Sequence, residues 1–365
     1  MAPGRIARPG ATLRSVTSPR LRVDDFDYEL PPEAIAQQPA EPRDASRLLV
    51  LDRATGRLDH ARFRDIGGWL KPGDLLVVND SRVIPARLRG TRDGGGAAEL
   101  LVLRPIAGDD RWEALVRPSR RIGDGDVITL SSGDSVEVGE RLGDGMRAVR
   151  FSGDPHAVMA AAGEMPLPPY IRDRSAPPER YQTVYARPPG SAAAPTAGLH
   201  FTPELLDALT ASGLGCSAVT LHVGLDTFRP LAGEYVDEHH IHREWYEVPP
   251  EARTAIDAAR AAGGRVVAVG TTAVRVLETA ARTGEPSGWS DLYITPPHRY
   301  TAVDALVTNF HLPRSSLLLL VTAFVQDGMD GAGAFEARDR LLGAYRVALE
   351  SGYRFFSFGD AMLIV

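Results

Sequence analysis

The side chains best suited to proton transfer in this sequence are its nine histidines, since an unperturbed imidazole changes charge between about pH 5 and 8. They are densest in residues 238–246, where His239 and His242 precede Glu244. We expect His242 and Glu244 to take part in acid–base chemistry or polar recognition. A zinc site formed by His239, His242 and Glu244 stays open as an alternative, although the spacing is not HExxH. His222, at the end of a predicted strand, could join this cluster.

A segment rich in small residues, 190–201, presents Thr196, Gly198 and His200 just before a helix that begins at Pro203. Backbone amides at a helix N-terminus bind carboxylates and phosphates well. Neither a Walker loop nor a GxGxxG fingerprint occurs in this segment. The alternative is a tight connection that merely requires small side chains.

The apolar strand predicted at 265–269 runs into Gly270, Thr271 and Thr272, which begin a helix that carries Arg275. Ligands of α/β sheets lie beyond the C-terminal ends of the strands, so this junction is a candidate pocket wall. The alternatives are that Thr272 is only a helix N-cap and that Arg275 forms an ordinary pair on the helix surface.

A third polar loop, 308–313, follows the strand predicted at 302–307 and contains Asn309 and His311. If the two strands are neighbours, their loops converge on one edge of the sheet. Asn309 would then supply hydrogen bonds and His311 possible acid–base chemistry. A purely structural histidine is the alternative.

The composition narrows the classes of function. The 365 residues include 41 basic and 47 acidic side chains, a formal charge of −6, which excludes a uniformly basic nucleic-acid-binding protein but not a local basic patch. One cysteine, Cys216, excludes a disulfide framework within the chain and a multi-cysteine metal site. No stretch approaches the roughly 20 apolar residues of a membrane helix.

The first 22 residues contain five arginines and no acid. They lack the apolar core of a secretory signal. We therefore expect a disordered basic arm over residues 1–22 and a cytoplasmic protein. An arm that touches nucleic acid is the alternative.

Short strands separated by Gly/Asp turns fill residues 79–153, which predicts an inserted six-stranded antiparallel β-barrel. Arg117, Arg120 and Arg121 form a basic cluster on it. A solvated turn is the alternative to RNA contact there. The predicted strands are 83–90, 97–106, 111–118, 126–131, 134–142 and 146–152.

Helical and strand patterns alternate in the rest of the chain, which indicates a layered α/β fold with a mixed or partly parallel sheet. We predict one discontinuous α/β catalytic domain over residues 23–78 and 154–365, interrupted by the small antiparallel β-barrel domain. The predicted helices are a short one at 27–38 and others at 203–212, 250–262, 271–282, 315–326 and 334–352. The predicted strands are 47–51, 74–78, 217–223, 265–269 and 302–307.

Several of these segments together resemble one family from about residue 23 to the C-terminus. The motifs are FDYELP (26–31), RDASRLLV (43–50), GDLLVVNDSRVIPAR (73–87), YQTVY (181–185), APTAGLHF (194–201), TNFHLP (308–313) and YRFFSFGDAM (353–362). On these motifs the chain is similar to the S-adenosylmethionine:tRNA ribosyltransferase-isomerases of queuosine biosynthesis. So many long matches in order make coincidence an inadequate explanation.

The resemblance implies an α/β domain with an inserted barrel and a definite reaction. The ribosyl part of S-adenosylmethionine would move onto 7-aminomethyl-7-deazaguanine in tRNA, giving epoxyqueuosine and releasing adenine and methionine. It implies no metal and no permanently bound cofactor, with S-adenosylmethionine as co-substrate, tRNA as partner and no membrane. We expect a monomer.

The resemblance also implies candidate roles for residues of this sequence. The catalytic candidates are His200, His242, Glu244, His311 and Asp360. The substrate-binding candidates are Arg82, Thr196, Gly198, His222, Arg229, Gly270, Thr271, Thr272, Arg275 and Asn309. The candidates for tRNA contact are Arg117, Arg120 and Arg121.

Two departures from the family pattern leave other functions open. Asp226 replaces a glycine within 224–230, and the Pro-Gly-Tyr turn usual near 294–300 is altered. A related S-adenosylmethionine-using enzyme with another acceptor is therefore an alternative. So are a metal-dependent hydrolase built on the histidine cluster and a non-catalytic RNA-binding protein.

Overall fold

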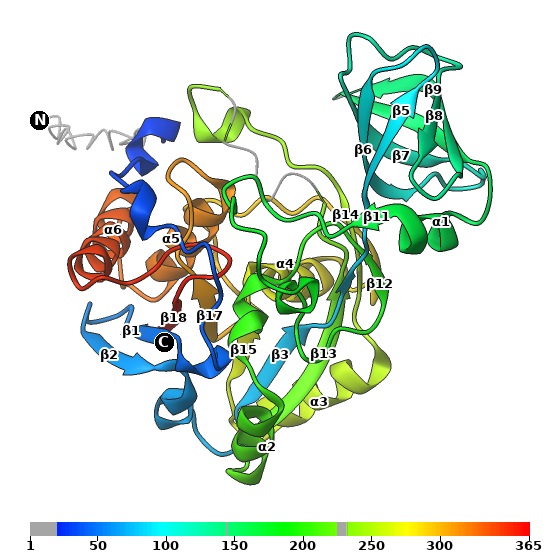
Figure 1. The fold of residues 1–365 in the computed structure, drawn as a ribbon. Coiled ribbons are helices and arrows are strands. Elements are labelled where there is room, and N and C mark those ends of the chain that lie inside the picture. Colours follow the sequence, from blue (N-terminus) through cyan, green and yellow to red (C-terminus); the bar gives the residue numbers. More distant parts are fainter. Residues whose placement is uncertain (1–19, 144, 225–230, 232) are drawn as a thin grey trace, which may run out of the picture.

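The larger part of the molecule is built around one nine-stranded mixed sheet (Figure 1). The computed structural model describes residues 20–143, 145–224, 231 and 233–365. The strand order is β16-β14-β13-β3-β15-β17-β18-β1-β2. The four central strands are parallel: β13 (Gly215–Leu221), β3 (Leu75–Asn79), β15 (Val266–Val269) and β17 (Ala305–Asn309).

Antiparallel pairings complete the sheet on both sides. On one side β14 (Glu244–Glu247) pairs with β13, and β16 (Ser287–Ser290) pairs with β14. On the other, β18 (Ala361–Ile364) runs antiparallel to β17 and parallel to β1 (Arg47–Leu51), and β2 (Leu58–Arg62) runs antiparallel to β1. The predicted α/β fold with a mixed sheet is confirmed.

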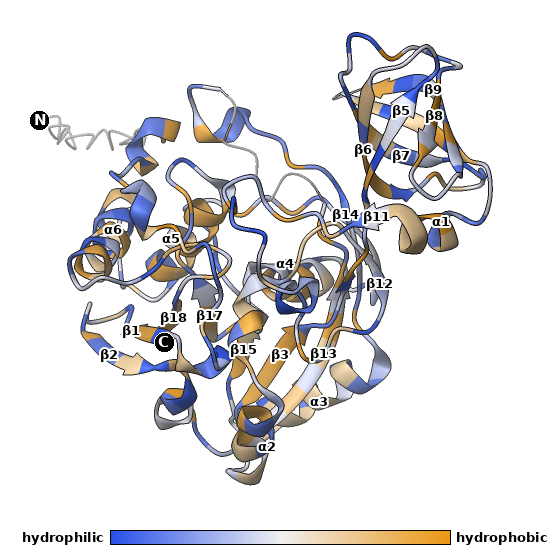
Figure 2. Ribbon diagram, in the orientation of Figure 1, coloured by the Kyte–Doolittle hydropathy of each residue, from blue (hydrophilic) through white to orange (hydrophobic). Residues whose placement is uncertain are grey.

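The central strands read as continuous apolar runs because both faces of the sheet are covered. Successive side chains point to opposite faces. In β3, Leu75 and Val77 pack into one core cluster while Leu76 and Val78 pack into the other. Figure 2 shows these strands as a hydrophobic band inside a more polar shell.

Five of the helices lie where the sequence predicts them, to within a few residues. Proline at the first helical position suits α2 and α3, since that position needs no N–H donor. Thr202 caps α2 and Ser315 caps α5 through their side-chain oxygens. The bounds are α2 (Pro203–Ala211), α3 (Pro250–Ala261), α4 (Thr271–Thr283), α5 (Ser316–Asp327) and α6 (Ala334–Glu350).

The predicted six-stranded antiparallel barrel is also confirmed and stands apart from the sheet (Figure 1, labels β5 to β9). Pairing of its first strand with β8 closes it, and its interior side chains form a core cluster of their own. The strands are β5 (Arg87–Arg92), β6 (Ala97–Pro105), β7 (Trp112–Arg117), β8 (Val127–Leu130), β9 (Ser135–Gly143) and β10 (Met146–Phe151). Helix α1 (Pro155–Ala162) and the short strand β11 (Gly163–Glu164) follow it.

Two predicted elements are wrong, both near prolines. The single strand expected at 83–90 is broken at Pro85: β4 (Arg82–Val83) pairs with β12 (Pro189–Ser191), and β5 begins at Arg87. A proline cannot donate to a strand ladder, which explains the break. The helix expected over 27–38 is replaced by 3-10 turns at Val23–Phe26 and Pro32–Ala34.

Most of the predicted N-terminal arm lies outside the described residues. Its last arginines contact the body of the protein: Arg20 pairs with Asp237 and Glu238, and Arg22 pairs with Glu234. Among the described residues, none of the helices is long and apolar enough to cross a membrane.

Candidate functional site

The loops that follow β15 and β17 line one narrow cavity together with the small-residue segment 194–197. The two strands are parallel neighbours, so their C-terminal ends meet at the same edge of the sheet. The predicted convergence of the two loops is therefore confirmed. Side chains with polar groups in this first cavity include Thr196, Thr272, Asn309 and His311.

The N-terminus of α4 forms one wall of the first cavity. Gly270 precedes the helix with a φ of 90°, a conformation that favours glycine, and a Cβ there would lie 3.5 Å from Ala197 Cβ and from Thr272 Oγ1. Thr272 Oγ1 is buried and has no hydrogen-bond partner among the described residues. The first N–H groups of an α-helix also have no partner within the helix. This wall is therefore suited to a carboxylate.

A buried hydrogen-bonded chain supports the opposite wall. Thr196 Oγ1 donates to Asn309 Oδ1 at 3.0 Å, and Asn309 Nδ2 lies 3.1 Å from His200 Nε2. His200 Nδ1 lies 2.8 Å from Ser46 Oγ. Burial, with smaller contributions from Arg354 and Arg43, lowers the pKa of His200 to about 3. A neutral ring with both nitrogens engaged can hold Asn309 in place but has no nitrogen left for a substrate.

His311 lies at the same cavity and is also buried. Its Nε2 is 2.7 Å from Thr308 Oγ1, and its backbone N–H donates to Tyr345 Oη at 3.0 Å. Burial lowers the pKa of His311 to about 3. The imidazole is therefore neutral near pH 7 and can act as a hydrogen-bonding group but not as a cation.

A buried ion pair joins α4 to the edge of the sheet. Glu244 is 5% exposed; its Oε2 pairs with Arg275, and its Oε1 accepts the N–H of Gly224 at 2.6 Å. Arg275 also donates to the carbonyl oxygen of Ser290 at 3.4 Å. The alternative of an ordinary surface pair for Arg275 is wrong, since its carboxylate partner belongs to β14. Glu278 accepts backbone N–H groups of residues 301 and 302.

A second, larger cavity lies between the barrel and the sheet edge formed by β14 and β16. Its volume is about 400 Å³, within the ~300–1,000 Å³ of small-molecule sites. His222, whose Nδ1 is buried without a described hydrogen-bond partner, stacks on Trp245 with ring centroids 5.3 Å apart. Burial lowers the pKa of His222. His242 and Glu244 line the same cavity.

The two cavities are adjacent. Val223 lines both of them. A smaller hollow shares Leu317 with the first cavity and His242 and Glu244 with the second. The ion pair of Glu244 and Arg275 therefore lines the small hollow that neighbours both cavities.

Several predicted site residues lie elsewhere. Asp360 accepts the backbone N–H groups of Arg47 and Arg354, each at 2.8 Å, and lines neither cavity. A Cβ on Gly198 would collide with the Tyr185 hydroxyl, so that glycine serves close packing. The exposed Arg82 donates to the carbonyl oxygen of residue 186 at 3.3 Å.

Three further predictions concern residues 226 and 229, the altered segment 294–300 and the alternative of a zinc site. Arg229 and Asp226 lie outside the described residues. The altered segment 294–300 places His298 Nε2 3.8 Å from the Glu278 carboxylate. For the proposed zinc site, the part of the chain that the structure describes contains no group of three His, Cys, Asp or Glu side chains placed to hold a metal ion.

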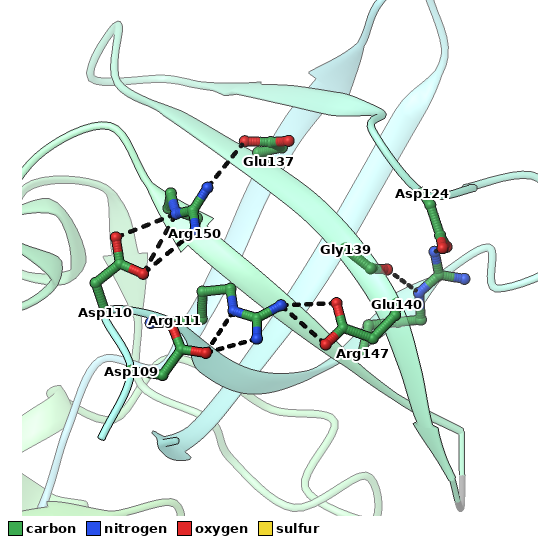
Figure 3. Close-up of polar contacts among 9 residues, drawn as sticks. All are labelled: Asp109, Asp110, Arg111, Asp124, Glu137, Gly139, Glu140, Arg147 and Arg150. Carbon is green, nitrogen blue, oxygen red and sulfur yellow. Dashed lines mark hydrogen bonds and ion pairs between the residues drawn. The ribbon is translucent and has the colours of Figure 1, made fainter. Parts of the chain in front are cut away.

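Several arginines of the barrel are paired with carboxylates. Figure 3 shows Arg111 bound to Asp109 and Glu140, with Arg147 and Arg150 also paired to carboxylates. The predicted basic cluster of Arg117, Arg120 and Arg121 is exposed and lies along a groove whose wall includes Glu99. The arginines of this groove are Arg89, Arg117, Arg120 and Arg121.

Sequence reasoning missed the aromatic part of the site. Tyr170 and Phe356 line the first cavity, and Trp112, Trp245 and Trp289 line the second. The strands β14 and β16 are short and were not predicted, so nothing placed their tryptophans beside the barrel. The apolar and aromatic residues around position 245 were the signal in the sequence that could have indicated strand β14.

Comparison with known proteins gives one consistent result. A family model described as "queuosine biosynthesis protein" matches residues 23–364. The S-adenosylmethionine:tRNA ribosyltransferase-isomerase from Moorella thermoacetica is 53% identical to this chain, and the match covers 94% of this chain and 100% of that protein. The enzyme of the same name from Heliobacterium modesticaldum is 54% identical, and the match covers 93% of this chain and 98% of that protein. The crystal structure of an S-adenosylmethionine tRNA ribosyltransferase from Thermotoga maritima is 41% identical with a TM-score of 0.53, covering 93% of this chain and 100% of its own.

Proposed function

The chain belongs to the family of queuosine biosynthesis proteins, and on this premise we propose that it is an S-adenosylmethionine:tRNA ribosyltransferase-isomerase. It transfers the ribosyl moiety of S-adenosylmethionine to 7-aminomethyl-7-deazaguanine in tRNA and isomerises it. The products are epoxyqueuosine, adenine and methionine. The observation that most supports this proposal is the adjacency of two cavities, one at the N-terminus of α4 and one against the barrel, which share Val223.

The methionine end of S-adenosylmethionine lies at the N-terminus of α4. The helix dipole and the free N–H groups of its first turn favour the carboxylate there. Thr272 Oγ1 supplies a further donor, since it is buried and unpaired within the described residues. Thr271 completes this wall, Asn309 lies on the opposite wall of the cavity, and Gly270 permits the close approach.

The reaction needs proton transfers at separate atoms. The sulfonium acidifies the adjacent C5′–H, so a base there can form a stabilised carbanion. The departing adenine needs a proton donor, and the attacking amine must be neutral. His242 and Glu244 line the part of the site that both reactants reach, and they are the candidates for these transfers.

The two neutral histidines have supporting roles in this proposal. His200 holds Asn309, and His311 offers a neutral hydrogen-bonding ring to the bound donor. Arg275 positions Glu244 through their ion pair. These assignments follow from the low pKa values of both histidines and from the partners already given.

The tRNA binds across the barrel. Arg117, Arg120 and Arg121 line its exposed groove and are suited to phosphate contacts. The protein acts as a monomer in the cytoplasm, where tRNA is modified. Light scattering of the purified protein tests the monomer.

The experiment is an assay of the full chain with S-adenosylmethionine and tRNA that carries the aminomethyl base. Release of adenine that depends on this tRNA is the expected result. Arms with unmodified tRNA and with the free base test the alternative of a different acceptor. A protein that binds the tRNA without releasing adenine in any arm would be an RNA-binding protein, and stoichiometric zinc with hydrolase activity would favour the metal-dependent alternative.

A further inference from the structure

Three of the chain's four tryptophans line the second cavity. They are Trp112 from the barrel, Trp245 from β14 and Trp289 from β16. The fourth, Trp69, packs against a core cluster of the α/β sheet. Because aromatic residues make up only 7% of the chain, this concentration gives the cavity large flat apolar surfaces that the roles assigned above do not use.

Three rings, those of His222, Trp245 and Trp289, lie along one wall of the cavity. Trp245 and Trp289 are directly opposite each other in the antiparallel pair β14 and β16, so their side chains are neighbours on one face. The His222 ring stacks on Trp245 at an interplanar angle of 19°. Trp289 keeps 49% of its surface exposed. A core packing role would bury that ring, whereas a binding surface leaves it open.

Polar groups surround this platform of His222, Trp245 and Trp289. The Arg104 guanidinium lies 4.7 Å from the centroid of the Trp289 ring. The Glu113 carboxylate fixes it with two hydrogen bonds of 2.8 and 3.2 Å. Arg104 also donates to the carbonyl oxygen of residue 243 at 3.1 Å, which joins the barrel to the sheet edge.

A glycine keeps the His222 ring in the platform. Gly190 has a φ of 148°, and a Cβ at that position would lie 2.8 Å from Cε1 of His222. Any other residue would therefore displace the ring. The buried Nδ1 of His222 has no hydrogen-bond partner among the described residues, and the residue lines the cavity.

We propose that the platform of His222, Trp245 and Trp289 holds the 7-deazaguanine base of the tRNA, turned out of the anticodon loop. This inference rests on the proposed function. Bases in RNA loops are recognised by stacking on aromatic side chains and by hydrogen bonds to their edges. The platform supplies the stacking surface, His222 Nδ1 can donate or accept one hydrogen bond, and the Glu113 carboxylate can accept hydrogen bonds from the base edge.

The position of the platform favours the acceptor base over the adenine of S-adenosylmethionine. One side of the cavity is built by barrel residues, and the barrel also carries the exposed arginine groove. An RNA bound along the barrel can therefore reach the platform. Val223 lines both this cavity and the cavity at the N-terminus of α4, where the donor is placed, so the two bound reactants are neighbours.

The test compares Trp289→Ala and Trp245→Leu with Leu142→Ala, an exposed residue of β9 that lies outside the cavity. Affinities are measured on the full chain for an anticodon stem–loop carrying the aminomethyl base and for S-adenosylmethionine. Loss of one stacking ring weakens base binding about tenfold or more. We expect that loss for the stem–loop with both tryptophan variants, an unchanged affinity for S-adenosylmethionine, and wild-type behaviour for Leu142→Ala.

Wild-type affinity for the stem–loop in both variants would overturn the proposal. Weaker binding of S-adenosylmethionine with unchanged stem–loop binding would also overturn it, because the platform would then hold the donor's adenine. Trp289 is half-exposed on an edge strand, so we expect Trp289→Ala to fold. The stem–loop affinity of that variant tests the proposal if Trp245→Leu fails to fold. Adenine release by the wild-type protein is measured separately: its absence refutes the proposed function, whereas tryptophan-dependent binding of the modified loop tests the platform.

Discussion

The buried ion pair of Glu244 and Arg275 gives the sharpest test of how the site is built. Its side chains are 5% and 13% exposed, so the Arg275→Met substitution leaves a buried carboxylate without its cation. Removing one partner of a buried pair costs about 3–5 kcal/mol of unfolding free energy. The same helix carries a matched control: Arg282 and Asp291 pair at 3.2 Å with side chains 53% and 54% exposed. An exposed pair contributes about 0–1 kcal/mol.

Urea denaturation of the full chain measures both variants, with fluorescence and circular dichroism compared to check for two-state unfolding. We expect Arg275→Met to lose several times more stability than Arg282→Met. Adding Glu244→Gln to Arg275→Met should restore much of the loss, since the amide still accepts the Gly224 N–H. Equal losses in the two single variants, or no recovery in the double variant, would refute the reasoning that the pair is buried and coupled.

Other parts of the site give three more predictions. Burial holds the pKa values of His200 and His311 at about 3, below the 6.5 of a histidine in the unfolded chain. Between these two values the unfolded chain binds more protons than the folded protein. The free energy of unfolding should therefore fall by about 1.4 kcal/mol per pH unit for each ring as the pH drops from about 6.5 towards 3. Urea unfolding at several pH values should show one such slope missing in His311→Gln, and an unchanged slope would contradict the burial argument. Gly270→Ala should cost about 1 kcal/mol or more because of the positive φ, and calorimetry should show weaker binding of S-adenosylmethionine; normal binding would remove Gly270 from the donor site. Replacing Arg120 and Arg121 by alanine should weaken tRNA binding. The slope of the logarithm of the binding constant against the logarithm of the salt concentration should become shallower by about one unit for each phosphate that the variant no longer neutralises. An unchanged slope in a salt titration would show that the RNA binds elsewhere.

Much of the fold could be predicted because local patterns and tertiary structure agree. The apolar runs of β3, β15 and β17 reflect burial on both faces, and alternating short strands with glycine turns mark the barrel. The errors have local causes: Pro85 breaks the predicted first barrel strand, and the proline pair at 31–32 prevents an α-helix. Short edge strands such as β16, with the sequence SGWS, carry too little periodicity to be recognised.

The site could be predicted in part. Loops at the ends of parallel neighbouring strands must meet, which is why Thr272, Asn309 and His311 share a cavity. Which charged residues pair across the fold is not encoded locally, so the partner of Arg275 and the backbone contacts of Asp360 required the structure. The same holds for the tryptophan cluster, whose members come from segments far apart in the sequence.

The most direct measurement is the stoichiometry of products from the full chain incubated with S-adenosylmethionine and tRNA that carries 7-aminomethyl-7-deazaguanine. Nucleoside mass spectrometry detects epoxyqueuosine in the digested tRNA, and chromatography measures adenine and methionine in the same sample. The proposed function predicts one adenine and one methionine for each epoxyqueuosine formed, and none of the three with unmodified tRNA. Adenine release without the modified nucleoside, or no product with a correctly folded protein, would contradict it.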